Sequence, residues 1–451
     1  MMSQDFKDRL FPILPQILRD FQPSLVSSDM DPRYWALSPG AVIVDERGIR
    51  ETVEMMWKYL LVRPGDTNFF AVKCNPNIHI LKLMLDLGFG LDCASPTELY
   101  LANLVGASPD RIMYTANNIQ ARYLEFALRL GCIINLDDIT GLDVLEAVLE
   151  KTGFPIPETI CFRYNPGNRR QDGGANFIIG NPVDQKYGLT YEQIFPAYCR
   201  AQEMGAKKFG IHTMYASNCL DPRVLAGNVT MQLDMVQEIE DQLGFPFDFV
   251  NAGGGIGVNY RPSEQPVDIV ELGRLIREAR LEFENKNGYL PRLWLESGRF
   301  VVAPHGALVG HVINVLDKHK RFIGVDFCDA ADIHRANIYE SAYHGVNILD
   351  SEGNLKPGEE MEVDIVGPLC ENVRLAKARK IPRTFTGDII VVEDAGGHVQ
   401  AMKMNYNGWG GSQTLLFRPD NSVVQIARAE TIGDLFANQI MPWEKTEVRT
   451  Y

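Results

Sequence analysis

Four short segments of the sequence carry side chains that could act together in chemistry. Lys73 lies in AVKCNPN, directly after an apolar run. A lysine amine in that place can form a Schiff base with an aldehyde cofactor. Gly253, Gly254 and Gly255 lie in NAGGGIG, where backbone N–H groups can converge on a phosphate without side-chain obstruction. Without a cofactor, Lys73 would be an ordinary solvated lysine and NAGGGIG an ordinary tight turn, and both alternatives stay open at this point.

The other two segments supply carboxylates, an arginine and a thiol. In LESGRF, Glu296 could pair with a protonated ring nitrogen, and Arg299 could bind a phosphate or a carboxylate. In GPLCEN, Cys370 and Glu371 are adjacent polar groups after a Gly-Pro turn. The ordinary alternatives are a surface ion pair for Glu296 and Arg299, and a buried structural cysteine beside a surface acid for Cys370 and Glu371.

Short apolar runs that alternate with helix-like stretches provide a framework for these side chains. Strands alternating with helices predict parallel βα units, and eight units match an α/β fold, the (β/α)8 barrel of about 250 residues. In such a barrel, Lys73 follows strand one, the glycines follow strand seven and Glu296 follows strand eight. All three then lie at the carboxyl ends of strands, where this fold places chemistry. The expected strands are 68–73, 90–95, 111–117, 131–136, 158–165, 208–214, 248–255 and 292–297.

The composition of the chain changes after residue 305. Runs such as GALVGHVINVLD and GDIIVVED are rich in β-branched residues and are separated by turns, which predicts a mostly antiparallel β domain. We expect a barrel over 46–305 and a β-rich domain built from 1–45 and 306–451.

Charge and composition exclude several classes of protein. The net charge is −14, from 58 acids and 44 bases, which disfavours nucleic acid as a partner. No apolar run approaches the roughly 20 residues of a membrane helix. The N-terminus lacks the layout of a secretory signal, and the eight cysteines form no C-x-x-C pair. We therefore expect a cytoplasmic protein with reduced cysteines, no membrane partner and no metal site.

Together the segments resemble the fold-type III decarboxylases that depend on pyridoxal 5'-phosphate (PLP), over roughly residues 40–425. FFAVKCNPN resembles the motif of the PLP-bearing lysine, and GFGLDCASPTEL resembles the second-strand motif. NAGGGIG resembles the phosphate loop, and LESGRF is similar to Glu-Pro-Gly-Arg, with Ser297 in place of proline. GPLCEN resembles a Gly-Pro-x-Cys-Glu motif that reaches across a dimer interface into the partner's active site.

The resemblance implies a PLP-dependent carboxy-lyase whose small-molecule substrate is an amino acid, and which is a homodimer with shared active sites. The β-rich domain is then expected to contribute to the substrate site and the dimer interface. Lys73 and Cys370 are the implied catalytic residues. The implied contacts of the cofactor are Lys73, His212, Ser217, Gly253, Gly254, Gly255, Glu296, Arg299 and His398.

Within this family, diaminopimelate decarboxylases are the most similar members. DIHRANIYESAYH (332–344) is similar to their segment Ile-Arg-Pro-Ala-Leu-Tyr…Ala-Tyr-His, in which the arginine and the tyrosine hold the distal carboxylate of the substrate. The resemblance therefore implies conversion of meso-diaminopimelate to L-lysine, a step of lysine biosynthesis. The implied substrate-binding residues are Arg299, Arg335, Tyr339, Glu371 and Arg374.

Three positions depart from the family pattern. Met214 replaces a histidine that stacks on the cofactor ring, His398 replaces a tyrosine, and Arg374 replaces an aspartate. A related decarboxylase for a carboxylated polyamine, a D-amino acid or a glutamate-like compound stays an alternative, since Arg374 would suit an additional acid group. A racemase is disfavoured by GPLCEN. A catalytically silent PLP-binding protein is disfavoured by the retained Lys73, Glu296 and glycine loop.

Overall fold

The structure is a computed structural model, and it describes residues 1–23, 31–169, 181–339 and 341–440. The chain forms two compact units. The first holds Met1 and Gly48–Pro304, and the second holds Met2–Arg47 and His305–Tyr451. No helix in these ranges is long and apolar enough to cross a bilayer.

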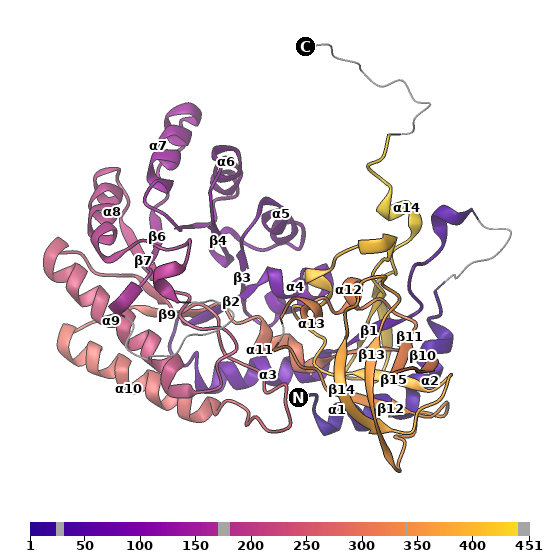
Figure 1. Cartoon of the computed structure of the whole chain (residues 1–451). Helices are drawn as coiled ribbons and strands as arrows, with labels where there is room; N and C mark the ends of the chain where they lie inside the picture. The colour runs from indigo at the N-terminus through magenta and orange to yellow at the C-terminus, as the bar shows by residue number, and fades with distance from the viewer. Residues whose placement is uncertain (24–30, 170–180, 340, 441–451) are drawn as a thin grey trace. The chain divides into compact units, whose positions relative to one another are not determined.

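Within the described residues, the first unit is a closed barrel of eight parallel strands. The barrel helices lie around the outside of these strands (Figure 1). The predicted (β/α)8 barrel is therefore confirmed. The strands are β2 (Thr67–Ala71), β3 (Gly90–Cys93), β4 (Ile112–Ala116), β5 (Ile133–Leu136), β6 (Thr159–Arg163), β7 (Lys208–His212), β8 (Phe249–Asn251) and β9 (Arg292–Leu295).

Local signals set the ends of the barrel helices. Ser95 accepts a hydrogen bond from Glu98 N with Pro96 in the first turn, and Asp268 caps the helix that follows β8 in the same way. Glycines in the left-handed conformation end four of the helices at 131, 153, 244 and 288. The helices are α3 (Glu46–Tyr59), α4 (Ile78–Asp86), α5 (Pro96–Leu104), α6 (Ala121–Leu130), α7 (Gly141–Thr152), α8 (Tyr191–Glu203), α9 (Pro222–Leu243), α10 (Ile269–Asn287) and α11 (Arg299–Val302).

Seven of the eight barrel strands end earlier than the apolar runs predict, and only β5 ends at the expected residue, Leu136. The largest difference is at β8, beside the glycine loop. β2 ends at Ala71, so Lys73 belongs to a single 3-10 turn, Val72–Cys74. β8 ends at Asn251 and β9 at Leu295. After β8 the backbone turns away at Gly253, whose φ of 65° is incompatible with a strand.

Large side chains fill the interior of the barrel. The rings of Phe249 and Trp294 stack with centroids 3.5 Å apart, and Phe69 lies 4.9 Å from Trp294. Met113 and Cys161 complete this cluster. The barrel is therefore packed, and ligand chemistry is confined to its rim.

The second unit is a mostly antiparallel sheet, as predicted. Most neighbouring strands are antiparallel, but β1 pairs with β16 and β11 with β13 in parallel. Its strands are β1 (Ala41–Asp45), β10 (Gly306–Asp317), β11 (Arg321–Val325), β12 (Val346–Leu349), β13 (Glu360–Val366), β14 (Ala376–Pro382), β15 (Ile389–Val392), β16 (Gln413–Phe417) and β17 (Val423–Ala427).

Short helices complete the second unit. Phe6, Leu10, Leu14 and Ile17 line one face of the N-terminal helices at helical spacing, and they share a core with the strands around Ile43. Removing these side chains from water holds the N-terminal segment on the sheet. The helices are α1 (Gln4–Leu10), α2 (Leu14–Asp20), α12 (Asp329–Asp332), α13 (Arg335–Ile338) and α14 (Ile432–Leu435).

Candidate active site

Lys73 lies at the carboxyl end of β2 and faces a carboxylate on the next strand. Its Nζ is 2.9 Å from Asp92 Oδ2. The Lys73 side chain is 51% exposed, whereas Asp92 is only 2% exposed. Asp92 Oδ1 is buried and has no hydrogen-bond partner among the described residues. The amine is therefore held by a fixed, buried acid but stays accessible to a ligand.

The charges around Lys73 favour its protonated form. Burial alone would lower the pKa of Lys73, but the charges of Asp92 and Glu296 outweigh that effect and raise this pKa. Burial raises the pKa of Asp92, and the charge of Glu296 raises it further. The amine has to lose its proton before it can react as a nucleophile, and Asp92 is the nearest group that could accept it.

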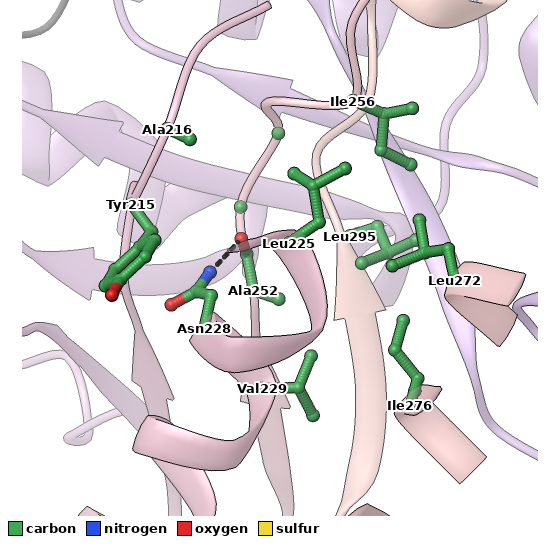
Figure 2. A pocket seen from close by; sticks show the side chains of 12 residues that line it. Tyr215, Ala216, Leu225, Asn228, Val229, Ala252, Ile256, Leu272, Ile276 and Leu295 are labelled. Carbon is green, nitrogen blue, oxygen red and sulfur yellow. Dashed lines mark hydrogen bonds between the residues drawn. The ribbon is translucent and has the colours of Figure 1, made fainter. Parts of the chain in front are cut away.

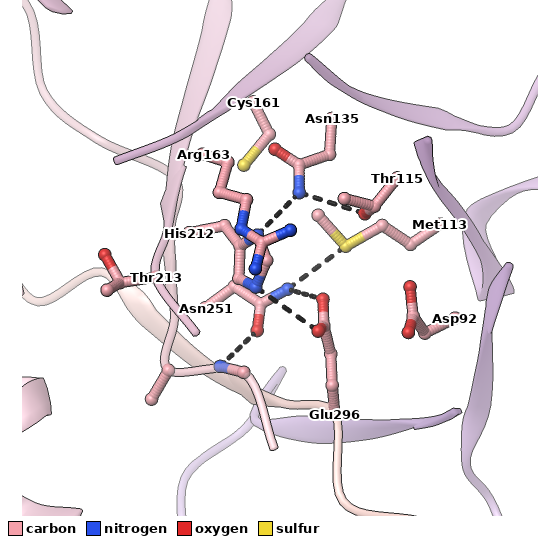
Figure 3. Close-up of polar contacts among 12 residues, drawn as sticks. Asp92, Met113, Thr115, Asn135, Cys161, Arg163, His212, Thr213, Asn251 and Glu296 are labelled. Carbon is pink, nitrogen blue, oxygen red and sulfur yellow. Dashed lines mark hydrogen bonds and ion pairs between the residues drawn. The ribbon is translucent and has the colours of Figure 1, made fainter. Parts of the chain in front are cut away.

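Glu296 lies beyond β9 at the centre of a buried polar network (Figure 3). Asn251 Nδ2 donates to Glu296 Oε1 at 2.8 Å, and His212 Nε2 lies 3.3 Å from Oε2. Asn135 Nδ2 is 2.8 Å from His212 Nδ1. With Asn135 as donor, Nδ1 accepts and Nε2 carries the hydrogen that faces Glu296.

This network keeps Glu296 ionised. Burial alone would raise the pKa of Glu296, but its contacts with His212, Lys73 and Asn251 lower it. A buried carboxylate that stays charged suits a protonated ring nitrogen as a partner.

The glycine loop after β8 packs closely against the loop after β7. A Cβ on Gly253 would lie 2.8 Å from Thr213 O and 3.3 Å from Met214 Sδ. Gly255, at φ 109°, would place a Cβ 2.6 Å from Ala216 O. Only glycine permits this close approach. Gly253 N already donates to Asn251 Oδ1, so the N–H groups of Gly254 and Gly255 are the ones that suit a phosphate.

An apolar cavity lies behind the glycine loop, between the barrel and helices α9 and α10 (Figure 2). Asn228 Nδ2 donates to Ala252 O at 2.8 Å and so holds the base of the loop. The other lining residues are Tyr215, Ala216, Leu225, Val229, Gly253, Gly254, Ile256, Leu272, Ile276 and Leu295.

The remaining barrel residues from the sequence analysis follow β7 and β9 in the chain. Arg299 begins α11, and its Nη1 donates to Tyr260 Oη at 3.0 Å. Ser217 is half-buried in the loop after β7. Buried Thr213 Oγ1 and Ser297 Oγ have no hydrogen-bond partner in the part of the chain that the structure describes.

These features fit PLP. The accessible amine of Lys73 suits the aldehyde, and the charged Glu296 suits the ring nitrogen. The loop of Gly253, Gly254 and Gly255 suits the phosphate. Thr213 and Ser297 are further polar groups that a ligand could satisfy.

In the second unit, Cys370 and Glu371 are exposed and lie beside Tyr406 and Asn407. Cys370 N donates to Asn407 Oδ1 at 3.0 Å, and Cys370 Sγ is 3.9 Å from Tyr406 Oη. Tyr406 Oη donates to Glu371 Oε1 at 3.4 Å. The hydrogen bond with Cys370 and the charge of Glu371 raise the pKa of Tyr406. Thiol, phenol and carboxylate thus form one exposed cluster.

Arg335 is buried on α13, and its Nη1 lies 3.2 Å from His344 Nε2. His344 Nδ1 in turn lies 2.8 Å from the carbonyl oxygen of Glu393. Tyr339 is half-buried and caps α13, with its N–H on Arg335 O.

The other two departures from the family pattern also lie in the second unit. His398 is half-buried and has a left-handed backbone, with φ 56°. Arg374 Nε binds Asp364 Oδ2 at 3.0 Å, and the same guanidinium donates to Asn372. The charge of Arg374 is therefore already matched within its own hairpin.

Several residues of these clusters were not singled out in the sequence. Asp92 lies inside GLDCAS, which the resemblance had marked as a motif without assigning the residue a role. Asn251 and His344 likewise lie inside NAGGGIG and DIHRANIYESAYH, which were marked as motifs without a role for either residue. Asn135 and Tyr406 gave no signal, because their partners His212 and Cys370 are distant in the sequence.

Comparison with known proteins agrees with the fold and the chemistry. The family model described as pyridoxal-dependent decarboxylase, pyridoxal binding domain, matches residues 49–303. Protein TabA of Pseudomonas amygdali pv. tabaci is 31% identical, over 96% of this chain and 95% of its own. A diaminopimelate decarboxylase of Methanothermobacter thermautotrophicus is 30% identical, over 89% of this chain and 91% of its own.

Solved structures show the same relationship. The diaminopimelate decarboxylase of M. jannaschii in complex with L-lysine has a TM-score of 0.80 at 25% identity, covering 89% of this chain and 92% of the other. The chain therefore belongs to the family of pyridoxal-dependent decarboxylases, which use PLP to remove CO2 from amino acids.

Proposed function

We propose that this decarboxylase converts meso-diaminopimelate to L-lysine. The observation that carries the proposal is the similarity, along most of the chain, to diaminopimelate decarboxylases such as the one from M. thermautotrophicus. The buried Arg335, in a segment similar to the distal-carboxylate site of those enzymes, supports the same substrate.

We assign the cofactor contacts as follows. Lys73 carries PLP, Glu296 holds a proton on the ring nitrogen, and His212 supports Glu296. The phosphate is bound by the N–H groups of the glycine loop together with Ser217, Arg299 and His398. When bound, PLP supplies a ring that takes up the electron pair released as CO2 leaves.

The reaction requires one proton at the α-carbon. The bond between the α-carbon and its carboxylate breaks, CO2 departs, and the electron pair of that bond is left at the α-carbon, from which the ring would draw it. Cys370 of the partner subunit is our candidate for delivering a proton to the α-carbon, and its thiolate is then reprotonated from solvent. The exposure of the Cys370–Tyr406–Glu371 cluster supports this role.

We assign recognition of the distal end to Arg335, Tyr339 and Glu371. In diaminopimelate that end carries a carboxylate, which suits an arginine, and an amine, which suits a glutamate. Arg299 and Arg374 are further candidates. The ion pair of Arg374 with Asp364 gives it a structural task as well.

Replacing Arg335 by alanine should change the substrate preference. A charge-assisted contact in a partly desolvated pocket contributes about 1.5–3 kcal/mol, so kcat/KM for meso-diaminopimelate should fall roughly tenfold to over a hundredfold. Substrates without a distal carboxylate, such as lysine or ornithine, should be affected little. Steady-state kinetics with both kinds of substrate test this.

Arg428→Ala is the matched control for Arg335→Ala. Arg428 forms an exposed ion pair with Asp434 and has no assigned role, so its loss should leave the preference unchanged. An Arg335→Ala enzyme with wild-type selectivity would contradict the assignment of Arg335.

We also propose that the enzyme is a homodimer with shared active sites. A two-fold dimer in which each chain lends Cys370 to its partner has two identical sites. Mixing inactive Lys73→Ala chains with inactive Cys370→Ala chains should then restore activity, because one site of each heterodimer is intact. Absence of recovery, with subunit exchange demonstrated by mass spectrometry, would rule out sharing.

One experiment tests the substrate assignment as a whole. The purified protein, loaded with PLP, is incubated with a panel of amino acids, and CO2 release is measured. Release from meso-diaminopimelate supports the proposal. Release only from a carboxylated polyamine, a D-amino acid or a glutamate-like compound would keep the family and replace the substrate.

A further inference from the structure

Asn251, the last residue of β8, joins two parts of the cofactor site through one side chain. It is fully buried. Its Nδ2 donates to Glu296 Oε1 at 2.8 Å, and its Oδ1 accepts from Gly253 N at 2.9 Å (Figure 3). One amide therefore contacts both the carboxylate assigned to the ring nitrogen and the loop assigned to the phosphate.

We propose that Asn251 is a positioning residue that fixes the Glu296 carboxylate relative to the glycine loop, so that both ends of PLP are held at once. This inference rests on the proposed roles of Glu296 and of the loop. Because both contact groups are held in place before PLP binds, less conformational entropy is lost on binding and the affinity is higher.

The orientation of the Asn251 amide is determined by its neighbours. Gly253 N is a donor and requires the oxygen of the amide, while the charged Glu296 requires the nitrogen. The second hydrogen on Nδ2 points to Met113 Sδ at 3.1 Å. A flipped amide would place oxygen against a carboxylate, so the two functional contacts depend on each other.

The backbone alone does not fix the carboxylate. Glu296 N donates to Gly253 O at 2.7 Å, and Ala252 N donates to Trp294 O at 2.9 Å. These bonds align the two strand ends but leave the side-chain torsions of Glu296 free. Asn251 and, on the other oxygen, His212 are the groups that orient the carboxylate.

The test is a double-mutant cycle that pairs Asn251→Asp with Glu296→Gln. Aspartate keeps the acceptor for Gly253 N but cannot donate to Glu296, and two carboxylates would then face each other. A glutamine at 296 can donate to that aspartate, which restores the hydrogen bond with reversed polarity. The dissociation constant of PLP, measured by titrating the apoenzyme and following cofactor absorption, is the primary readout.

Asn251→Asp alone should weaken PLP binding by about tenfold or more, as expected for a bond to a charged group. In the Glu296→Gln background the same change should alter the dissociation constant by less than about twofold. The kcat of the double variant should stay as low as that of Glu296→Gln, because the negative charge is no longer at position 296.

Asn228→Asp is the matched comparator. Asn228 is a buried asparagine that supports the same loop through Ala252 O. In the part of the chain that the structure describes, its other side-chain hydrogen bonds are with Thr213 O and Gln232 Nε2, not with Glu296. Its effect on PLP binding should be the same in both backgrounds. If Asn251→Asp does not fold, Asn251→Leu should weaken PLP binding more than Asn228→Leu does.

These measurements distinguish a wrong role for Asn251 from a wrong role for Glu296. If Glu296→Gln changes neither the PLP spectrum nor kcat, the role of Glu296 is wrong and the inference falls with it. If Glu296→Gln is impaired but the effect of Asn251→Asp is equal in both backgrounds, only the link through Asn251 is overturned.

Discussion

Replacing Lys73 by alanine is expected to give a protein that releases CO2 at least about 10⁴-fold more slowly. A positioned acid–base group alone contributes about 10²–10⁴-fold, and this variant also loses the covalent hold on the cofactor. The wild-type protein should be yellow, and borohydride should fix PLP irreversibly on Lys73. Peptide mapping after reduction identifies the modified residue.

Lys82→Ala is the control for this substitution. Lys82 is an exposed lysine on α4 that pairs with Asp86, and its loss should leave both colour and activity intact. A wild-type protein that takes up no added PLP, or borohydride labelling at another lysine, would show that the assignment of Lys73 is wrong.

Replacing Glu296 by glutamine should have the second largest effect. Glutamine keeps the shape of the side chain and an oxygen for Asn251 Nδ2, but it has no charge to hold a proton on the ring nitrogen. Removing one preorganised electrostatic group typically costs about 10²–10³-fold in kcat. We therefore expect a yellow protein with a fall in kcat of that size and a shifted absorption band.

Glu284→Gln is the matched control for Glu296→Gln. Glu284 pairs with Arg63 on the partly exposed outer face of the barrel, so its loss should leave kcat unchanged. If Glu296→Gln retained kcat within about threefold of the wild type, the ring would not depend on this carboxylate.

Much of the fold could be predicted from the sequence because strands buried on both faces leave near-continuous apolar runs. Each of the eight predicted runs, such as those that end at Lys73, Gly255 and Ser297, overlaps one barrel strand. The predicted carboxyl ends of the strands were less accurate. At Lys73 a 3-10 turn and at Gly253 a left-handed backbone interrupt the strands where ligands bind.

The contacts within the candidate site could not be predicted in the same way. Asn251 and Glu296 are 45 residues apart, and nothing in their spacing indicates contact. They meet because β8 and β9 pair in a register that sets Asn251 opposite Trp294, two residues before Glu296. Arg374 is a similar case. Its ion pair with Asp364 arises from the β13–β14 hairpin, whereas the sequence alone indicated only a charge that departs from the family pattern.

The parallel pairing of β1 with β16 has a consequence for the synthesis of the chain. Ala41–Asp45 emerge from the ribosome early, yet their partners, Gln413–Phe417, emerge near the end. The barrel is a continuous segment between them and can close first, since domains generally fold as units during translation. Until β16 is synthesised, one edge of β1 has no partner strand. The apolar faces of α1 and α2 also lack Leu415 and Phe417, with which they share a core in the folded protein. We therefore expect truncation before residue 413 to leave a folded barrel attached to an aggregation-prone N-terminal segment.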